Sequence, residues 1–402
     1  MIGRTAAVIG VGFGDEGKGL ATDCLCSGFD NATVIRHNGG AQAGHTVEFG
    51  GNRFVFHQLS SGSFRHADTF WAQMFMPDLY KLETELLDFK EVSGFKPDIY
   101  ADYDVCPTFI DDILINMALE KSRGEKRHGS CGMGINEAAL RICAGFGLTI
   151  QFIKTCDASR LYNELLRIRK EYVACRLESL GLKRNELGEY GELLDSKTVL
   201  FNFAEQMAQN ACYVNVVNNC EDYFARQDRV IFEGAQGLLL DSENKEYAPH
   251  VTASRTGLAN PVSLCKKYGL KLDLIVYVMR SYVTRHGAGP LPHECEKATL
   301  GNISEDLTNR ENEWQGKLRY GRYESPASLA SRILTDVDGC DAEVALFITH
   351  LNETNGSIRF SSGDMAADKF KFHPEFHGRI KDAFLSYSPD SKFSTKVNLG
   401  RP

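Results

Sequence analysis

The chain has 402 residues, of which 43% are hydrophobic, and a formal net charge of −8. It can bury a large core, and its overall field excludes a general attraction to nucleic acid or to an anionic membrane, so anionic substrates must be held by local lysines and arginines. The twelve cysteines show neither a CxxC pair nor a Cys/His spacing suited to zinc, which favours reduced thiols in the cytoplasm. We predict a single large α/β domain with insertions over residues 1–402, and no segment approaches the roughly 18 apolar residues of a membrane span.

The first predicted element is a buried strand over residues 6–9, which runs into a glycine-rich loop over residues 10–19. A helix is predicted from Ala21 onward. Glycines permit a tight turn with bare backbone amides, and such a loop at a helix N-terminus binds phosphate. An ordinary strand-to-helix turn is the alternative, and the Asp-Glu-Gly-Lys-Gly core of the loop argues against it.

The spacing within this loop is that of a Walker loop, whose amides and lysine hold phosphate oxygens. Gly12, Gly17 and Lys18 occupy the expected positions, but Gly19 stands where a serine or threonine normally binds magnesium. Asp15 can replace that hydroxyl, because a carboxylate among phosphates is repulsive unless a cation or a proton to be abstracted is also present.

A second glycine-rich loop follows the next predicted strand, residues 32–36, and extends over residues 37–47. We expect His45 to face the first loop, because the carboxyl ends of parallel strands meet at one edge of a sheet. A loop histidine often has no special role, and it is the density of flanking glycines that favours a ligand site here. A further strand is predicted over residues 54–59, where we interpret His57 as structural.

Residues 128–134 combine three glycines and a hydroxyl with adjacent basic residues, which predicts a second anion-binding loop, with a flexible surface loop as the alternative. This loop leads into a helix that carries Arg141. From Asp157 to about Leu182 the apolar residues recur with helical periodicity, which predicts an outer structural helix without chemistry.

Three later strands are each followed by polar residues. The strand over residues 230–232 runs into Glu-Gly-Ala-Gln-Gly, where Gln236 can make a bidentate contact to a base or an amide, or merely satisfy backbone. The strand over residues 272–279 delivers two arginines and a histidine into a loop that suits an anionic ligand. Residues 314–322 offer three more cations, and a last buried strand is predicted over residues 344–349.

In this order, these motifs resemble those of the adenylosuccinate synthetase family from end to end. The close matches are residues 14–19, 39–47, 233–237 and 284–294. The corresponding family motifs are GDEGKG, GGxNAGHTV, EGAQG and TRVGAGPxPTE. The resemblance implies an α/β fold with a central, mostly parallel sheet flanked by helices, a P-loop-like NTP-binding fold with insertions, and a homodimer whose sites are completed across subunits.

The family couples IMP, a 6-oxopurine nucleotide, to aspartate and so forms adenylosuccinate in purine biosynthesis. The γ-phosphate of GTP first moves to O6 of IMP, and the aspartate amine then displaces that phosphate. O6 is a poor nucleophile until N1 loses its proton, so a carboxylate must face N1, and the transferring phosphoryl group needs a cation and a proton donor. Two alternatives stay open: a paralogue that uses ATP and a different amine or acceptor, and a non-catalytic regulator that binds nucleotides.

The resemblance also implies roles for individual residues. Asp15 would be the catalytic base and a ligand of Mg²⁺, His45 the general acid, and Gly44 a backbone ligand of the same ion. Lys18 and Gln236 would also take part in catalysis. The residues expected to hold the donor nucleotide are Gly14, Glu16, Gly17, Lys18, Gly19, His350, Asn352, Ser386 and Ser388. The residues expected to hold the acceptor or the amine are Asn38, Gln42, Ser130, Cys131, Arg141, Gln236, Leu240, Thr252, His286, Lys317 and Arg319.

The chain departs from the family pattern at several of these positions. Asn352 stands where the family has an aspartate that reads guanine, and an amide can also suit the N6 amine and N1 of adenine, so the donor is GTP or ATP. Lys317 keeps the positive charge of the family's arginine but not its planar, bidentate guanidinium. The threonines of the family's aspartate loop have no counterpart in this chain. Asp15 argues for an acceptor of the inosine type, because a viral branch that uses deoxyguanylate has serine there. Arg141 would reach the acceptor phosphate of a neighbouring subunit.

Overall fold

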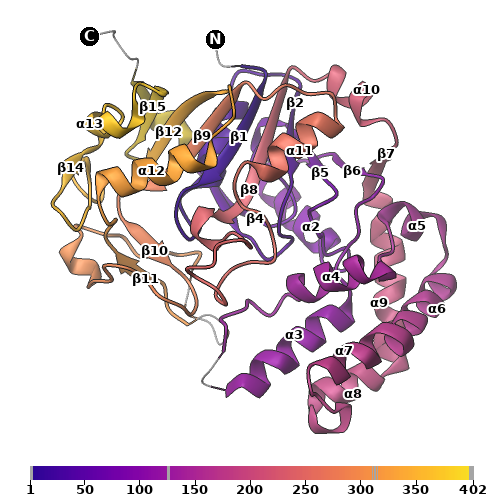
Figure 1. Cartoon of the computed structure of the whole chain (residues 1–402). Coiled ribbons are helices and arrows are strands. Elements are labelled where there is room, and N and C mark those ends of the chain that lie inside the picture. Colours follow the sequence, from indigo (N-terminus) through magenta and orange to yellow (C-terminus); the bar gives the residue numbers. More distant parts are fainter. Residues whose placement is uncertain (1–2, 125–126, 310, 312–313, 315, 398–402) are drawn as a thin grey trace.

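The computed structural model describes residues 3–124, 127–309, 311, 314 and 316–397. A ten-stranded sheet forms its centre, in the order β16-β15-β12-β9-β1-β8-β2-β5-β6-β7 (Figure 1). Its strands are β1 (Thr5–Gly10), β2 (Ala32–Arg36), β5 (Asp68–Trp71), β6 (Ile99–Asp102), β7 (Val214–Val217), β8 (Arg229–Gly237), β9 (Leu274–Arg280), β12 (Glu343–Thr349), β15 (Ile380–Ser386) and β16 (Ser394–Val397). Every adjacent pair is parallel except β15 with β16.

Helices flank this sheet, and short hairpins complete the chain. The helices are α1 (Lys18–Cys26), α2 (Leu82–Ser93), α3 (Ile110–Arg123), α4 (Ile135–Arg141), α5 (Ile150–Thr155), α6 (Ala158–Ile168), α7 (Ala174–Ser179), α8 (Glu189–Asp195), α9 (Lys197–Asn210), α10 (Cys220–Ala225), α11 (Ala259–Lys267), α12 (Pro326–Asp336) and α13 (Ala367–Phe370). The hairpins pair β3 (His45–Phe49) with β4 (Asn52–Phe56), β10 (Val283–Arg285) with β11 (Arg319–Gly321), and β13 (Ser357–Ile358) with β14 (Met365–Ala366).

The parallel strands are apolar because both faces of the sheet are covered. Alternate residues of β1 enter different cores, as the two-residue period of a strand requires. Ala7 and Ile9 pack in one cluster with side chains of α11 and α12, whereas Ala6 and Val8 pack in another with side chains of α1. The predicted α/β fold with a mostly parallel sheet is therefore confirmed, while the single domain over residues 1–402 stays a prediction.

A helical lobe is inserted between β6 and β7 and carries α3 to α9 (Figure 1). Its core includes Leu161, Leu165 and Ile168 of α6. The helix predicted from Asp157 is confirmed: Asp157 caps α6 by accepting a hydrogen bond of 2.7 Å from the amide of Arg160, and α6 continues through a π-helical turn into α7.

The strand predicted over residues 54–59 ends early, at Phe56. The amides of His57, Gln58 and Leu59 instead donate to the buried carboxylate of Glu85, at 2.8, 3.0 and 3.1 Å. Three successive amides that converge on one carboxylate cannot also form a strand ladder, so this segment forms a turn.

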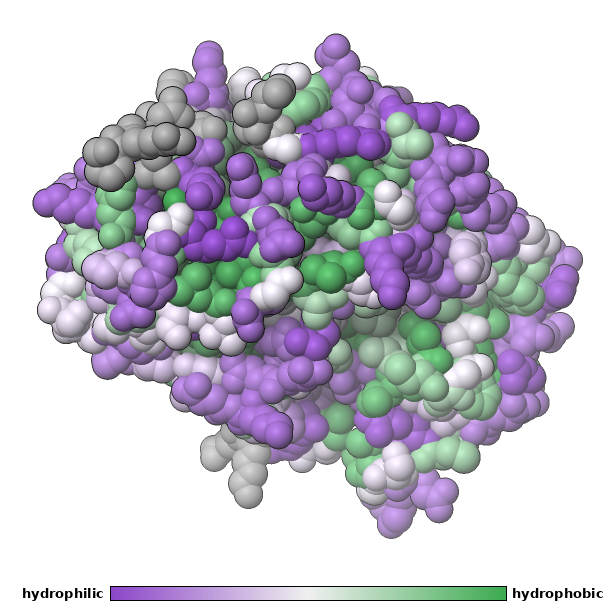
Figure 2. Space-filling model, turned by 45° about the horizontal axis from the view of Figure 1, so that its top comes forward, coloured by the Kyte–Doolittle hydropathy of each residue, from purple (hydrophilic) through white to green (hydrophobic). Residues whose placement is uncertain are grey.

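The surface adds little information about function. On the face shown in Figure 2, hydrophilic residues predominate and hydrophobic ones gather in small groups. Among the residues that the structure describes, no helix combines the length and apolar character needed to cross a bilayer. All twelve cysteines carry free thiols.

Candidate active site

One cavity of about 760 Å³ lies at the carboxyl ends of β1, β2, β8, β9 and β12. Its size is that of a small-molecule site, and the central strands of a parallel sheet are where such sites form. The predicted site residues on its wall are Gly14, Asp15, Gly17, Lys18, Gly19, Gln42, Gly44, His45, Ser130, Cys131, Gln236, Leu240, Thr252, His286, His350, Asn352 and Ser388. The structure thus brings together residues from widely separated stretches of the chain.

The glycine-rich loop after β1 is organised around Glu16. Its carboxylate lies beneath the loop, where Oε1 accepts hydrogen bonds from the amides of Gly12 and Gly14 at 3.0 and 2.9 Å. Oε2 forms an ion pair of 2.6 Å with Nζ of Lys18, which lies on the cavity wall. A Cβ at Gly237 would lie 2.4 Å from the carbonyl oxygen of Gly12 and 2.5 Å from Oε1, so glycine is required there. The Glu16 carboxylate therefore supports the loop from below and does not line the cavity.

Asp15 presents its carboxyl group to the cavity from an unusual backbone conformation. Its φ is +60°, in the left-handed region, and its carbonyl accepts a hydrogen bond from Nε of Arg280. Burial raises the pKa of the Asp15 carboxyl, against the opposing charges of Arg280 and Lys18. A buried carboxyl with a raised pKa is a stronger base than an exposed one, which suits proton abstraction.

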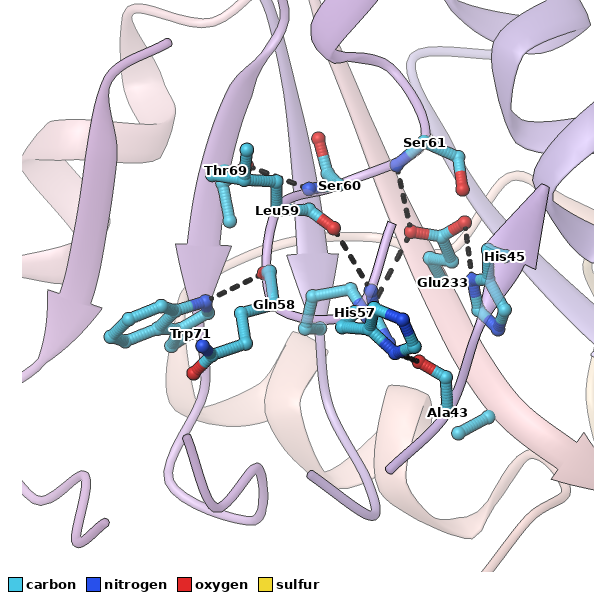
Figure 3. A network of polar contacts seen from close by, with 12 residues as sticks. Ala43, His45, His57, Gln58, Leu59, Ser60, Ser61, Thr69, Trp71 and Glu233 are labelled. Atoms are coloured by element: carbon cyan, nitrogen blue, oxygen red, sulfur yellow. Dashed lines mark hydrogen bonds and ion pairs between the residues drawn. The ribbon is translucent and has the colours of Figure 1, made fainter. Parts of the chain in front are cut away.

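His45, the first residue of β3, is oriented by Glu233 of β8. Its Nδ1 lies 2.8 Å from Oε1 of Glu233, whose other oxygen accepts the Ser61 amide at 3.2 Å (Figure 3). Burial alone would raise the pKa of Glu233, but His45, Arg36 and Ser61 outweigh it and hold that pKa at about 2. Because a carboxylate only accepts, Nδ1 carries the hydrogen of this bond, and Nε2 is left free of it. Burial lowers the pKa of His45 against the opposing effect of Glu233, which favours the neutral ring.

Two amide side chains on the cavity wall have oxygens without a partner. Oε1 of Gln42 and Oε1 of Gln236 are buried and accept no hydrogen bond from any residue that the structure describes. Gln236 also has a φ of +63°. Buried polar atoms are almost always paired in native proteins, so these two oxygens point to a ligand that carries donors.

The loop before α4 is held against α3. Oγ of Ser130 donates to Asn116 at 2.9 Å, and the amides of Gly129 and Ser130 donate to Glu120 at 3.2 and 3.4 Å. Ser130 and Cys131 face the cavity, and Leu240, Thr252 and His286 form other parts of its wall. This arrangement places the second predicted anion-binding loop at the same cavity as the first.

The end of β12 contacts the glycine-rich loop that follows β1. Oγ1 of Thr349 donates to the carbonyl of Glu16 at 2.8 Å and lies 2.8 Å from Nδ1 of His350. His350 and Asn352 line the cavity together with Ser388, whereas Ser386 is buried and donates to the carbonyl of Ser388. Ser386 therefore shapes this turn and does not face the cavity.

Besides Glu16, Ser386 and Arg141, three predicted ligand residues lie off the cavity wall. Asn38 is buried and exchanges two hydrogen bonds with the backbone of Ala235, at 3.0 and 2.7 Å, which ties the loops after β2 and β8 together. Lys317 has a 76% exposed side chain that lies 3.7 Å from Glu311. Arg319 forms a bidentate pair with Glu294, at 2.8 and 2.5 Å. In this state none of the three is presented to a ligand in the cavity.

The expectation for Arg141 is overturned. Its side chain is fully buried within its own subunit, where it pairs with Asp112 and donates to the carbonyls of Pro107 and Phe146. The guanidinium also lies 3.6 Å from the ring centre of Phe109. A side chain enclosed in this way cannot reach a phosphate in a neighbouring subunit, so we assign Arg141 to the core of the helical lobe.

This structural assignment predicts that Asp112→Ala destabilises the protein. The change leaves a buried guanidinium without its counter-ion, and we expect the free energy of unfolding to fall by about 3–5 kcal/mol. Urea denaturation followed by circular dichroism measures this. The matched control is Glu171→Ala, which removes an exposed partner of Arg167 and should cost less than about 1 kcal/mol. Equal effects of the two changes would contradict the assignment.

The cavity also fits a divalent cation whose coordination shell is completed by oxygens of the substrate. Mg²⁺ is usually bound by one or two carboxylates together with waters and phosphate oxygens. Asp15 and the backbone of Gly44 both lie on the cavity wall. Within residues 3–124, 127–309, 311, 314 and 316–397 there is no cluster of three or more metal-binding side chains. A site that relies on phosphate oxygens needs no such cluster.

Sequence reasoning missed the supporting residues of this site. No motif assigns a role to Glu233, although a charged residue that ends a predicted buried strand is a usable signal of function. The sequence pattern marks Arg280 only as one cation among several. Asp306, which lies on the cavity wall 3.2 Å from Arg280, sits in a polar loop without any local signal.

Comparisons with known proteins show the family to which the chain belongs. The family model described as adenylosuccinate synthetase matches residues 7–323. A curated relative, "Adenylosuccinate synthetase" from Photobacterium profundum, is 30% identical over 393 residues, which are 92% of this chain and 84% of the relative.

Two solved structures share the fold at 17% sequence identity. One is a fully ligated adenylosuccinate synthetase from Plasmodium falciparum, with a TM-score of 0.72 over 98% of this chain and 99% of that chain. The other is the succinoaminodeoxyadenylate synthetase (PurZ) of cyanophage S-2L bound to dGMP and to dATP as an energy donor, with a TM-score of 0.60 over 98% of this chain and 95% of that chain. From the family match and the curated relative, the chain belongs to the adenylosuccinate synthetase family.

Proposed function

We propose that this ligase couples a 6-oxopurine nucleotide of the IMP type to aspartate through a 6-phosphoryl intermediate, at the expense of a nucleoside triphosphate, and forms adenylosuccinate. The observation that carries the proposal is the meeting of three features in one cavity: a phosphate-binding loop with Lys18, a half-buried carboxyl at Asp15, and an imidazole at His45 held by Glu233. A site that only bound nucleotides would need no proton chemistry.

In the first step, Asp15 takes the proton from N1 of the purine, which makes O6 nucleophilic. O6 then attacks the γ-phosphorus, the bond from this phosphorus to the bridging oxygen breaks, and a nucleoside diphosphate leaves. Lys18 would exchange its partner Glu16 for phosphate oxygens. A positioned base of this kind contributes about 10²- to 10⁴-fold in rate.

In the second step, the amine of the second substrate attacks C6. The C6–O6 bond breaks, the amine loses a proton, and O6 leaves with the phosphate. The negative charge of the phosphoryl group favours a protonated His45, which Glu233 stabilises from the other side of the ring, and Nε2 can then donate to the departing phosphate. When bound by Asp15 and Gly44, Mg²⁺ would neutralise charge on the phosphate oxygens.

The donor base is predicted to be read by Asn352, which stands on the cavity wall at the end of β12. An amide offers one acceptor and one donor, so it suits adenine as well as guanine, whereas a carboxylate accepts both N1–H and the exocyclic amine of guanine. Asn352→Asp should therefore shift the ratio of kcat/KM for GTP over ATP upward by about tenfold, since one good bidentate contact is worth roughly 1–3 kcal/mol. An unchanged ratio would show that Asn352 does not read the base.

A paralogue that uses a different amine is the second candidate. Its support is the altered amine loop, where Lys317 is exposed and Arg319 is already engaged by Glu294. One assay separates the candidates: purified protein with IMP and Mg²⁺ is supplied with GTP or ATP and with aspartate or other amines, while absorbance at about 280 nm and phosphate release are followed. Phosphate with aspartate supports the leading proposal, phosphate only with another amine supports the paralogue, and no phosphate supports a nucleotide-binding regulator.

The cellular setting is also a proposal. We propose a cytoplasmic homodimer, in line with the free cysteines and with the family. Because Arg141 is enclosed in its own subunit, any partner contribution to the acceptor phosphate has to come from another residue.

A further inference from the structure

Arg280, the last residue of β9, lies behind the catalytic loop. Its buried guanidinium makes three contacts at once: Nε donates to the carbonyl of Asp15, Nη1 to the hydroxyl of Tyr282 at 3.2 Å, and Nη2 to the carboxylate of Asp306 at 3.2 Å. The guanidinium presents its N–H groups in one rigid plane, whereas a lysine ammonium has three rotatable donors on a flexible stem and does not hold the same geometry.

Asp306 has no free capacity for a ligand. One of its oxygens accepts the amides of Thr308 and Asn309, at 3.0 and 2.9 Å, and the other accepts the Asn309 side chain at 3.1 Å as well as Arg280. A carboxylate with four donors is saturated. Although Asp306 lies on the cavity wall, it acts on the site through Arg280 and not through substrate.

Residues 302–309, here called the strap, connect this ion pair to the rest of the site. The amide of Ser304 donates to Glu353 at 3.0 Å, and Glu353 in turn accepts the Tyr282 hydroxyl at 2.6 Å. The Thr308 hydroxyl lies 2.8 Å from that of Thr46, the neighbour of His45. The strap therefore contacts the second glycine-rich loop at Thr46 and the segment after β12 at Glu353, and it reaches the first glycine-rich loop through Arg280.

Asp15 needs such support because its backbone is strained. A non-glycine residue in the left-handed region costs about 1 kcal/mol or more and persists only where surrounding contacts enforce it. Its neighbours Gly14 and Gly17 also have positive φ, at +100° and +94°, so the loop has little regular structure of its own. The Asp15 carbonyl is the point at which Arg280 fixes this conformation from outside the loop.

We infer that Arg280 is a positioning residue for Asp15, and that the strap holds Arg280 in place through Asp306. The catalytic part of the inference rests on the proposed function, since it takes Asp15 as the base. The structural part, that the conformation of the loop depends on Arg280 and Asp306, stands without it.

The test compares Arg280→Met, Arg280→Lys and Asp306→Asn with the wild type. The matched control is Asp364→Asn, which removes the charge of a carboxylate that pairs with Arg322 at 3.0 Å and with Arg359, outside the cavity. Hydrogen exchange of peptides covering residues 10–19 is measured without ligand, and kcat and KM are measured in the ligase assay. Thermal unfolding shows which variants are folded. If Arg280→Met does not fold, Asp306→Asn, which leaves Arg280 in place, provides the test.

We expect exchange over residues 10–19 to become about tenfold faster in Arg280→Met and Asp306→Asn and to stay unchanged in the control. We expect kcat to fall about 100-fold while KM for the triphosphate changes less than about threefold, because a misplacement of the base by about 1 Å has this effect. Arg280→Lys should restore part of the lost kcat. Unchanged exchange, or a raised KM with normal kcat, would overturn the inference. If the wild type has no ligase activity, the proposed function fails and the exchange result alone decides on the positioning role.

Discussion

Asp15→Asn is expected to lower kcat by about 10²- to 10⁴-fold while triphosphate binding stays measurable. The amide has nearly the same shape but cannot take a proton from N1, so O6 of the acceptor stays a poor nucleophile. The backbone contact with Arg280 involves the Asp15 carbonyl and is untouched by the change. Steady-state kinetics gives kcat, and isothermal titration with a non-hydrolysable triphosphate gives the affinity.

The control for this change is Asp338→Asn, which alters an exposed carboxylate outside the catalytic cavity and should leave kcat unchanged. Turnover like that of the wild type in Asp15→Asn would reject Asp15 as the base. Loss of triphosphate binding together with turnover would instead assign Asp15 to binding.

Glu233→Gln should have the second largest effect, with kcat lowered by about 10²- to 10³-fold. Glutamine can still accept the hydrogen on Nδ1 of His45, but it lacks the charge that stabilises the imidazolium formed during the reaction. Because the two residues act as one unit at 2.8 Å, the double variant His45→Asn with Glu233→Gln should be little worse than His45→Asn alone. The kcat values of the wild type and the three variants form the double-mutant cycle that measures this.

The Glu233 carboxylate also lies 3.8 Å from the buried Arg36, so its substitution removes a buried counter-ion and lowers stability. Thermal unfolding of each variant is therefore measured together with the kinetics. Ser61→Ala is the matched comparison, because it leaves the Ser61 amide that donates to Glu233 and should retain most of the activity. Additive losses in the double variant would contradict the coupling of Glu233 to His45.

The buried strands could be predicted closely from the sequence. Strands covered on both faces consist of nearly continuous apolar residues, as the match of residues 344–349 with β12 (Glu343–Thr349) illustrates. Helix starts were less accurate: α1 begins at Lys18 and not at Ala21, because Gly17, at a φ of +94°, already turns the chain into the helix. The order of strands in the sheet depends on pairing between distant segments and leaves no trace in local patterns.

The residues of the site could likewise be predicted only in part. Asp15, Lys18 and His45 could be found because glycine spacing marks loops that approach a ligand closely. Whether a polar residue faces the cavity or the core is decided by distant partners, as the enclosure of Arg141 by Asp112 shows. For the same reason no local pattern revealed Asp306, whose importance arises only where its loop meets Arg280.

The most direct test of the central claim follows the oxygen of the purine. IMP labelled with ¹⁸O at O6 is incubated with the protein, aspartate, Mg²⁺ and either GTP or ATP, and the released phosphate is analysed by mass spectrometry. If O6 receives the phosphoryl group and leaves with it, every phosphate formed with product carries the label. Product formed together with unlabelled phosphate would contradict phosphorylation at O6 and with it the roles given to Asp15 and His45.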